Sequence, residues 1–246
     1  MTIRTDGIII REQTVGEQDR LVTLLTREKG VIRAFVGGGR NPKNKNVSAT
    51  DLLCYSDFSL EKGRQDSYII REATPKQVFF ELRSDILGLS LAQYFAELAK
   101  DFSPKEEQSD EFLSLLLNAL YLICQGKKSY QLIKAVTELR FASIAGFMPD
   151  LISCGSCGDC ESPEFYFSPT TASLYCSSCV KAHDAKIISP GVLGAMRHIV
   201  LSAPEKIFSF SISDDSLEAL NYFTERYIKN LTMRKYKTLD FYKTMQ

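Results

Sequence analysis

The chain has 246 residues, of which 44% are hydrophobic and 24% are charged, and its 30 basic side chains balance 30 acidic ones, as in an ordinary globular protein. It contains no signal peptide and no apolar run near the 18 or so residues that a membrane span needs, so we expect a cytoplasmic protein. The seven cysteines are odd in number and clustered at metal-binding spacing, which favours a reducing compartment over a disulfide framework.

The first 75 or so residues are predicted to form β-structure. Short runs rich in β-branched and aromatic residues occupy residues 3–11, 20–26, 31–36, 52–60 and 67–73. Residues 27–30 link the second and third runs, and Gly30 suits the left-handed position of a short hairpin. Residues 61–66 link the fourth and fifth in the same way. Five strands in so short a segment predict an OB-fold barrel at residues 1–78.

From about residue 79 the apolar period changes from two to 3.6, which indicates helices. Ser129 and the pair Ser189-Pro190 are helix-start signals, and a last helix is expected over residues 213–231. The predicted fold class is therefore α+β. A barrel is followed by a larger helical domain at 79–246, into which a four-cysteine zinc site is inserted.

Two Cys-x-x-Cys pairs define that site. They comprise Cys154, Cys157, Cys176 and Cys179, and eighteen residues separate the two pairs. Four thiolates complete the tetrahedral shell that Zn²⁺ accepts, with no position left open for substrate, so a structural zinc is predicted. Gly158 can take the positive φ that the first turn needs. The site would staple a loop of about 40 residues, longer than compact domains normally carry unsupported.

Two further residues leave the ligand set open. Cys160 repeats the two-residue interval after Cys157, and His183 follows Cys179 by four residues. Either could replace one sulfur. Ordinary buried thiols or redox cysteines are the alternative interpretation of the whole cluster.

A basic segment follows the second predicted strand. Its six basic residues, against one acidic residue, are the candidates for binding DNA: Arg27, Lys29, Arg33, Arg40, Lys43 and Lys45. Residues 37–46 contain no apolar side chain and are expected to form a mobile basic loop. OB-folds bind single strands through a positive groove and aromatic platforms. The aromatic candidates are Phe35, Tyr55, Phe58 and Tyr68, although such residues in a small barrel more often lie in the core.

The C-terminal segment is also basic. Its cations are Arg226, Lys229, Arg234, Lys235, Lys237 and Lys243, interleaved with aromatic residues. They are compatible with a second basic surface and equally with a helix end and a frayed tail. The chain has no P-loop, no His-Glu-x-x-His and no zinc-deaminase signature, so no enzyme is indicated.

Several segments together resemble the RecO family of bacterial recombination mediators. They are GIII at residues 7–10, GEQDRLV at 16–22, LTREKG at 25–30, YFAEL at 94–98, ELRF at 138–141 and GFMPDL at 146–151, which runs into the first cysteine pair and Gly158. The order and spacing of these segments make the resemblance specific over most of the chain. The chain departs from the family where Gly37–Gly39, Asn44 and Asn46 stand in place of more basic and hydroxyl residues.

The resemblance implies an N-terminal OB-fold, a helical domain and a zinc site. It also implies binding of single- and double-stranded DNA, annealing of complementary strands, and assistance, together with RecR, in loading RecA onto strands coated by single-strand-binding protein. A bacterial, nucleoid-associated location goes with this. Arg33, Arg40, Lys43 and Lys45 would then face DNA, and Lys134 and Arg140 are candidates for contacting single-strand-binding protein.

Two other functions compete with this one. The first is a zinc-stapled protein-interaction scaffold, in which the basic loop only aids solubility. The second is an RNA-binding OB-fold protein, which would need a contact to the 2′-hydroxyl to prefer RNA.

Overall fold

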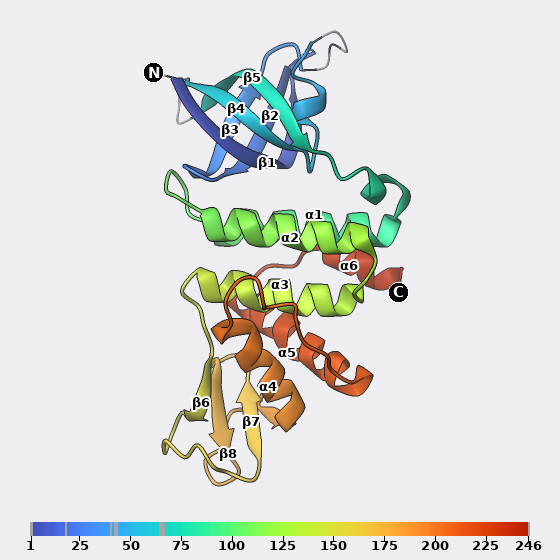
Figure 1. The fold of residues 1–246 in the computed structure, drawn as a ribbon. Helices are drawn as coiled ribbons and strands as arrows, with labels where there is room; N and C mark the ends of the chain where they lie inside the picture. Colours follow the sequence, from blue (N-terminus) through green and yellow to red (C-terminus); the bar gives the residue numbers. More distant parts are fainter. Residues whose placement is uncertain (1, 18, 40, 42–43, 64–66, 246) are drawn as a thin grey trace. The chain divides into compact units, whose positions relative to one another are not determined.

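The computed structural model describes the 246-residue chain except residues 1, 18, 40, 42–43, 64–66 and 246. The chain forms two compact units (Figure 1). The first comprises residues 1–125 and 236–246, and the second comprises residues 126–235. Among the described residues, no helix is long and apolar enough to cross a bilayer.

The described residues of the first unit form five strands, two short 3₁₀ helices and three α-helices. These are β1 (Thr2–Val15), β2 (Asp19–Thr26), β3 (Gly30–Val36), η1 (Ser48–Thr50), β4 (Tyr55–Lys62), β5 (Tyr68–Gln77), η2 (Phe80–Ser84), α1 (Ile86–Phe102), α2 (Asp110–Gln125) and α6 (Lys237–Thr244).

The strands close into a barrel in the order β1-β2-β3-β5-β4, with β4 pairing back onto β1. Among the described pairings of the barrel, only that between β3 and β5 is parallel. The predicted OB-fold barrel is confirmed. Side chains alternate along each strand, and the inward set fills the barrel. That core consists of Ile9, Val22, Leu24, Ile32, Ala34, Val36, Phe58, Leu60, Tyr68 and Ile70.

Gly30 begins β3 in the left-handed conformation, with φ of 56°, as its place in the hairpin predicts. A Cβ at this position would lie 2.2 Å from the carbonyl oxygen of Pro104, so glycine is also required by the close approach of the segment after α1. The amide of Val31 donates to that same carbonyl at 2.8 Å. The β2–β3 turn is thereby fixed against the helices of its own unit.

The C-terminal segment ends in a helix rather than in a frayed tail. α6 packs on α1, and its Leu239 and Tyr242 are buried. Just before α6, the Tyr236 hydroxyl donates to Asp101 at 2.8 Å and its ring lies edge-on to Tyr94. This short apolar face is hard to recognise in the sequence, because charged residues are scattered through residues 226–246.

The second unit contains three α-helices and a small sheet. These are α3 (Tyr130–Ile144), β6 (Asp150–Cys154), β7 (Phe165–Ser168), β8 (Ser173–Cys176), β9 (Lys186–Ile188), α4 (Pro190–Leu201) and α5 (Asp214–Thr232). The side chains of Ser129 and Ser189 cap α3 and α4 by accepting the amides of Leu132 and Val192, as predicted. The four-stranded sheet, in the order β6-β8-β7-β9, was not predicted.

The boundary predicted between residues 78 and 79 falls in the short link between β5 and η2. The division into compact units lies elsewhere, because α1, α2 and α6 belong with the barrel. As a division into separate domains, residues 1–78 and 79–246 stay a prediction.

Candidate metal centre and nucleic-acid interface

The two cysteine pairs meet at one point of the second unit. The sulfurs of Cys154, Cys157, Cys176 and Cys179 all lie within 4.8 Å of one another. The Sγ atoms of Cys157 and Cys176 are 3.8 Å apart, which is about the edge of a tetrahedron with metal–sulfur bonds near 2.3 Å. Cys160 and His183 are exposed and lie outside this group. The wide-spaced pairs are therefore the set that the fold brings together.

Local backbone geometry shapes both turns. Cys154 ends β6 and Cys176 ends β8, and these two strands pair in parallel. In the first turn the amide of Gly158, at φ of 77°, donates to the Cys154 carbonyl at 2.8 Å. In the second turn the amide of Cys179 donates to the Cys176 carbonyl at 3.0 Å. Each turn thus directs its two sulfurs to the same side.

The pKa values of two thiols in the cluster, Cys154 and Cys179, are shifted in opposite directions. Backbone hydrogen bonds at Cys176, Cys157 and Ser156 lower the pKa of Cys154 to about 6. The neighbouring sulfurs of Cys176 and Cys157 raise the pKa of Cys179 to about 12. Four thiolates this close repel one another unless a cation lies among them. The donor set therefore fits a soft, tetrahedral divalent metal such as Zn²⁺.

The small sheet joins the cysteine cluster to the helices of the second unit. Phe167 on β7 is fully buried, and its ring lies edge-on to those of Phe223 and Tyr227 on α5. Arg197 on α4 donates to the carbonyls of Leu151 and Ile152 on β6, at 2.7 and 3.3 Å. A metal in the cluster would consequently stabilise an element that is packed into the helical core.

The barrel presents a basic and aromatic hollow on the outer side of β2, β3 and β5. Strand β3 alternates, so Ile32 and Ala34 point into the core while Arg33 and Phe35 point outward. The hollow has a volume of about 550 Å³. It is lined by Leu21, Arg33, Phe35, Lys62, Gly63, Ser67 and Ile69.

Sheet register extends this surface onto β1. Thr23 pairs with Arg33 on one side and with Arg11 on the other, and directly opposed residues share a face. Arg11 is exposed. Arg11 and Lys62 lie outside the basic segment between Arg27 and Lys45 and were not predicted. The signal that could have found them is the period-two pattern of the first and fourth strands.

Of the four aromatic candidates, only Phe35 stands on this surface, with 36% of it exposed. Phe58 and Tyr68 are 2% and 3% exposed and belong to the barrel core. Tyr55 is half-buried; its hydroxyl donates to Asp6, and Lys76 lies over its ring. The preference of aromatic residues for the core of a small barrel explains this outcome.

The predicted basic residues are divided among different surroundings. Arg33 lines the hollow, and Lys29 is half-buried. Arg27 forms ion pairs with Asp6 and Asp110. Lys45 is exposed, 3.4 Å from Glu72. Arg40 and Lys43 lie outside the described residues.

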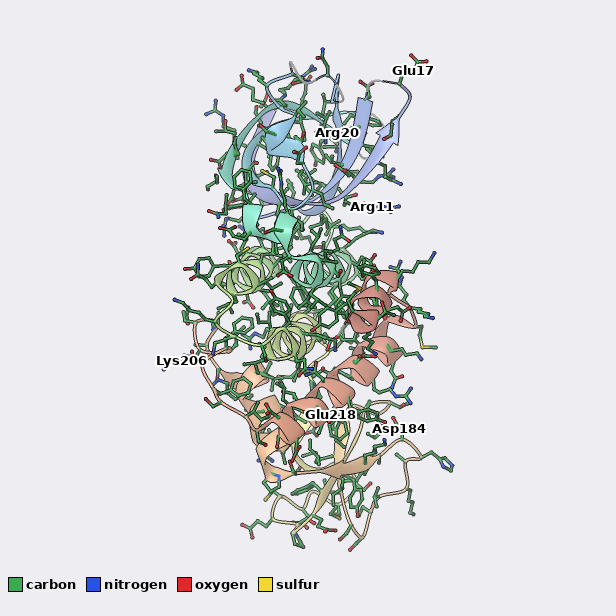
Figure 2. All side chains as sticks on the ribbon, turned by 90° about the vertical axis from the view of Figure 1, so that its right-hand side faces the viewer. Arg11, Glu17, Arg20, Asp184, Lys206 and Glu218 are labelled. Carbon is green, nitrogen blue, oxygen red and sulfur yellow. The ribbon has the colours of Figure 1, made fainter. Side chains whose placement is uncertain are left out.

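The described residues after β3 are hydrogen-bonded to the barrel rather than detached from it. At the start of the segment, Asp19 accepts the amide of Gly38 at 2.8 Å. At its end, Arg20 donates to the Thr50 hydroxyl at 2.7 Å and to Asp51 at 3.2 Å. Figure 2 labels Arg20 among the strands of the barrel. Two consecutive residues of β2 therefore hold Gly38, near the start of the loop expected at residues 37–46, and Thr50 and Asp51, which follow that loop.

Asn46, the last residue of the loop predicted at residues 37–46, binds β5. Its side chain accepts the amide of Ala73 at 3.1 Å and donates to the carbonyl of Arg71 at 3.2 Å, so it pairs with β5 as a strand residue would. Asn44 contributes a bond from its side-chain amide to the carbonyl of Gly37 at 2.7 Å. The two asparagines that depart from the family pattern are thus hydrogen-bonded to backbone groups of the described residues.

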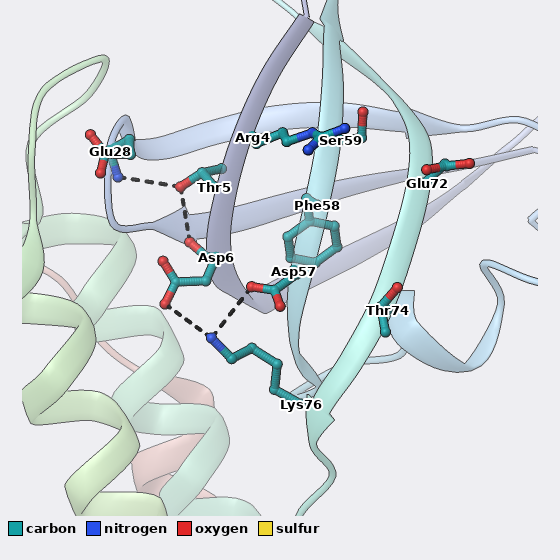
Figure 3. A pocket seen from close by; sticks show the side chains of 10 residues that line it. All are labelled: Arg4, Thr5, Asp6, Glu28, Asp57, Phe58, Ser59, Glu72, Thr74 and Lys76. Atoms are coloured by element: carbon teal, nitrogen blue, oxygen red, sulfur yellow. Dashed lines mark hydrogen bonds and ion pairs between the residues drawn. The ribbon is translucent and has the colours of Figure 1, made fainter.

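A second hollow of about 590 Å³ lies on the outer side of β1, β4 and β5 (Figure 3). It is lined by Arg4, Thr5, Asp6, Glu28, Asp57, Phe58, Ser59, Glu72, Thr74 and Lys76. Burial raises the pKa of Asp6, but hydrogen bonds from Arg27 and Tyr55 outweigh this and leave it below its ordinary value. Lys76 lies between Asp6 and Asp57, at 3.8 and 3.3 Å. With four carboxylates among its lining residues, this face suits phosphate less well than the face that carries Arg33.

The two residues considered for a protein partner are engaged within the second unit. Lys134 is 3% exposed and forms an ion pair with Glu138 at 3.0 Å, beside Glu225 at 3.5 Å. Arg140 donates to the carbonyls of Ile199 and Val200 at the end of α4, at 3.2 and 2.9 Å. Lys134 is thus a core residue and does not offer its charge to a partner.

Comparison with known proteins agrees with this architecture. Residues 1–79 match the family model described as "Recombination protein O N terminal", and residues 83–240 match "Recombination protein O C terminal". The chain is 34% identical to a protein of Acetivibrio thermocellus named "DNA repair protein RecO", over 99% of this chain and 97% of that protein. Proteins with the same name from Alkaliphilus metalliredigens and Desulforamulus reducens are 30% and 26% identical. The first match covers 93% of both chains, and the second covers 97% of this chain and 93% of the relative. The chain belongs to the RecO family.

Proposed function

We propose that this protein is a non-catalytic mediator of DNA repair and recombination that binds DNA through the outer face of β2, β3 and β5. The observation that carries this proposal is the convergence of Arg33, Phe35 and Lys62 on one open hollow of the barrel. Cations bind the phosphates, and an exposed aromatic ring offers a base a stacking platform. Such binding has little sequence preference and weakens steeply with salt.

The proposed activity follows from sequence-independent binding together with family membership. A surface that accepts both single and double strands can hold two complementary strands while they pair. On this basis the protein anneals strands and, together with RecR, assists RecA loading onto strands coated by single-strand-binding protein.

We further propose that Cys154, Cys157, Cys176 and Cys179 hold a structural Zn²⁺. When bound, the metal would cross-link the ends of β6 and β8 and the turns that follow them. The chain supplies all four ligands, so the proposed contribution of the metal is to the stability of the second unit rather than to any reaction.

The test is the annealing of two complementary labelled oligonucleotides, with and without single-strand-binding protein, across a salt series. Acceleration that persists on coated strands and fades with salt is expected. No acceleration at low salt by a metal-loaded protein would contradict the proposal and favour a protein-interaction scaffold. Tighter binding of RNA than of DNA of the same sequence would favour an RNA-binding protein.

A further inference from the structure

Two cations from different elements of the second unit approach one tyrosine ring. The Nζ atom of Lys186, the first residue of β9, lies 4.1 Å from the centroid of the Tyr222 ring on α5. The guanidinium carbon of Arg226, one turn further along α5, lies 5.9 Å from the same centroid. Lys186 and Arg226 are exposed, and Tyr222 is half-buried. The negative face of the ring helps to hold the cations close together.

Among the described residues, neither Lys186 nor Arg226 forms a direct ion pair with a carboxylate. Ion pairs among the described residues of the second unit join Lys134 to Glu138 and to Glu225, and they include neither Lys186 nor Arg226. Asp184, two residues before Lys186, accepts hydrogen bonds from Ser168 and Thr170 instead. Burial raises the pKa of Tyr222, but the two cations outweigh it and leave this pKa below its ordinary value. The ring thus lies in a net positive field.

A third cation continues the same face. Lys229 is exposed and follows Arg226 by three residues, and residues at spacings of three and four share one face of a helix. We call Lys186, Tyr222, Arg226 and Lys229 the α5 patch. Glu218, labelled in Figure 2, lies one turn before Tyr222. Glu225 shares the face by the same spacing, and its carboxylate lies 3.5 Å from the Nζ atom of Lys134. Two exposed cations on α5 and one on β9 therefore lie close enough together to contact a phosphate backbone.

We propose that the α5 patch binds the phosphate backbone of single-stranded nucleic acid, as a second contact surface in addition to the hollow on the barrel. This inference rests on the proposed function. Lys186 covers part of the Tyr222 ring, so contact is made through the cations rather than by base stacking. Ile187 is exposed, but it points to the opposite side of β9 from Lys186, and Phe223 is 2% exposed. The patch therefore lacks the apolar anchor that a peptide would use.

The experiment measures binding of the full chain to a labelled oligothymidylate by fluorescence anisotropy over a salt series. Each phosphate contact on a single strand contributes about 0.7 to the slope of log affinity against log salt. The double variant Lys186→Ala/Arg226→Ala is expected to have a slope shallower by about 1.4. Lys186→Arg/Arg226→Lys keeps both charges and should keep the slope.

Lys206→Ala is the control for Arg226→Ala, because it also removes one exposed charge from the second unit. Figure 2 labels Lys206 on the other side of this unit from Asp184. Thermal unfolding of each variant should match that of the unchanged protein, because the replaced side chains are exposed. If the double variant unfolds at a lower temperature than the unchanged protein, the salt slopes of Arg226→Ala and Arg226→Lys are compared instead. A shallower slope for Arg226→Ala alone would support the α5 patch, and equal slopes would contradict it.

The outcomes separate this inference from the function on which it rests. If the unchanged protein does not bind the oligothymidylate at low salt, the proposed function itself is contradicted. Binding with the same slope in the double variant and in Lys206→Ala would overturn the α5 patch alone. The patch would also be overturned if the double variant loses binding to an oligoglutamate peptide while its DNA slope stays unchanged, since the surface would then recognise an acidic protein segment.

Discussion

Arg27 and Asp6 form a bidentate ion pair in which Nε lies 2.9 Å from Oδ1 and Nη2 lies 2.9 Å from Oδ2. The same guanidinium also binds Asp110 at the start of α2. The backbone repeats this connection, because the amide of Arg27 donates to the Asp6 carbonyl at 3.0 Å and the amide of Ser109 donates to the Arg27 carbonyl at 2.9 Å. Arg27, one of the six basic residues considered for DNA binding, therefore ties the β2–β3 turn to β1 and α2.

Replacing Asp6 with Asn should lower the free energy of unfolding at pH 7 by about 1–2 kcal/mol, since Arg27 loses a charged partner but stays partly exposed. The pKa of Asp6 lies below its ordinary value of 3.8 in the folded protein, so the pair stabilises the fold above that pH. This contribution is lost as pH falls through the folded pKa. Urea unfolding of both proteins at pH 7 and near pH 3 measures it. A difference that stays constant between these pH values would contradict the assignment.

Asn46 should be essential to the order of the segment after β3. Asn46→Ala removes the bonds to Ala73 and Arg71 and leaves backbone groups of β5 without these partners, which should cost about 1–3 kcal/mol. We also expect faster proteolysis within residues 37–51. The neighbouring variant Lys45→Ala is the control, because its exposed ion pair with Glu72 contributes little. Equal proteolysis of the two variants would show that Asn46 does not hold the segment.

Stacking and charge in the hollow on β2, β3 and β5 should contribute to DNA binding in ways that can be measured separately. Phe35→Ala should weaken single-strand binding by about 1–3 kcal/mol with little change in salt dependence, because it removes a stacking platform. Arg33→Ala should make the salt slope shallower by about 0.7. Arg4→Ala is the matched control, since it removes the same charge from the other hollow. If Arg4→Ala changed the salt slope as much as Arg33→Ala does, the assignment of DNA to the face of β2, β3 and β5 would be contradicted.

The cysteine cluster should control the stability of the second unit. Cys176→Ser, or removal of metal with a chelator, should lower the thermal stability of this unit while the barrel still binds DNA weakly. Cys160→Ser should retain both the metal and the stability, because Cys160 lies outside the group of sulfurs that meet. Metal content per chain and thermal unfolding provide the measurements. Loss of DNA binding at normal thermal stability would contradict this division of roles.

Removing one partner of the buried Lys134–Glu138 pair and removing both should affect the stability of the protein differently. Lys134→Ala leaves the Glu138 carboxylate, which is fully buried, without its cation and should cost about 3–5 kcal/mol. Lys134→Met/Glu138→Leu removes both charges and should be close to neutral or stabilising. Chemical denaturation of both variants tests this. A double variant as unstable as Lys134→Ala would mean that the Thr224 hydroxyl, which donates to Glu138 at 2.7 Å, also requires the carboxylate.

The barrel and the cysteine cluster could be predicted because their signals are local. Period-two alternation and Gly30 specify strands and a hairpin, and the spacing of two Cys-x-x-Cys turns matches the geometry of one metal ion. The sheet of the second unit could not be predicted in this way. Its strands, such as β9 with three residues, are too short to show a period, and they form only when paired with one another.

The sequence by itself determined the barrel, the helix starts at Ser129 and Ser189, and the four cysteines that can meet. Only the tertiary structure decided what each charged residue does. Strand register places Arg11 and Arg33 on one face, while Arg27 is neutralised by Asp6 and Asp110, which are distant in sequence. The physical reason is that a charge acts through its neighbours in space, and pairing between strands and packing of helices determine which neighbours it meets.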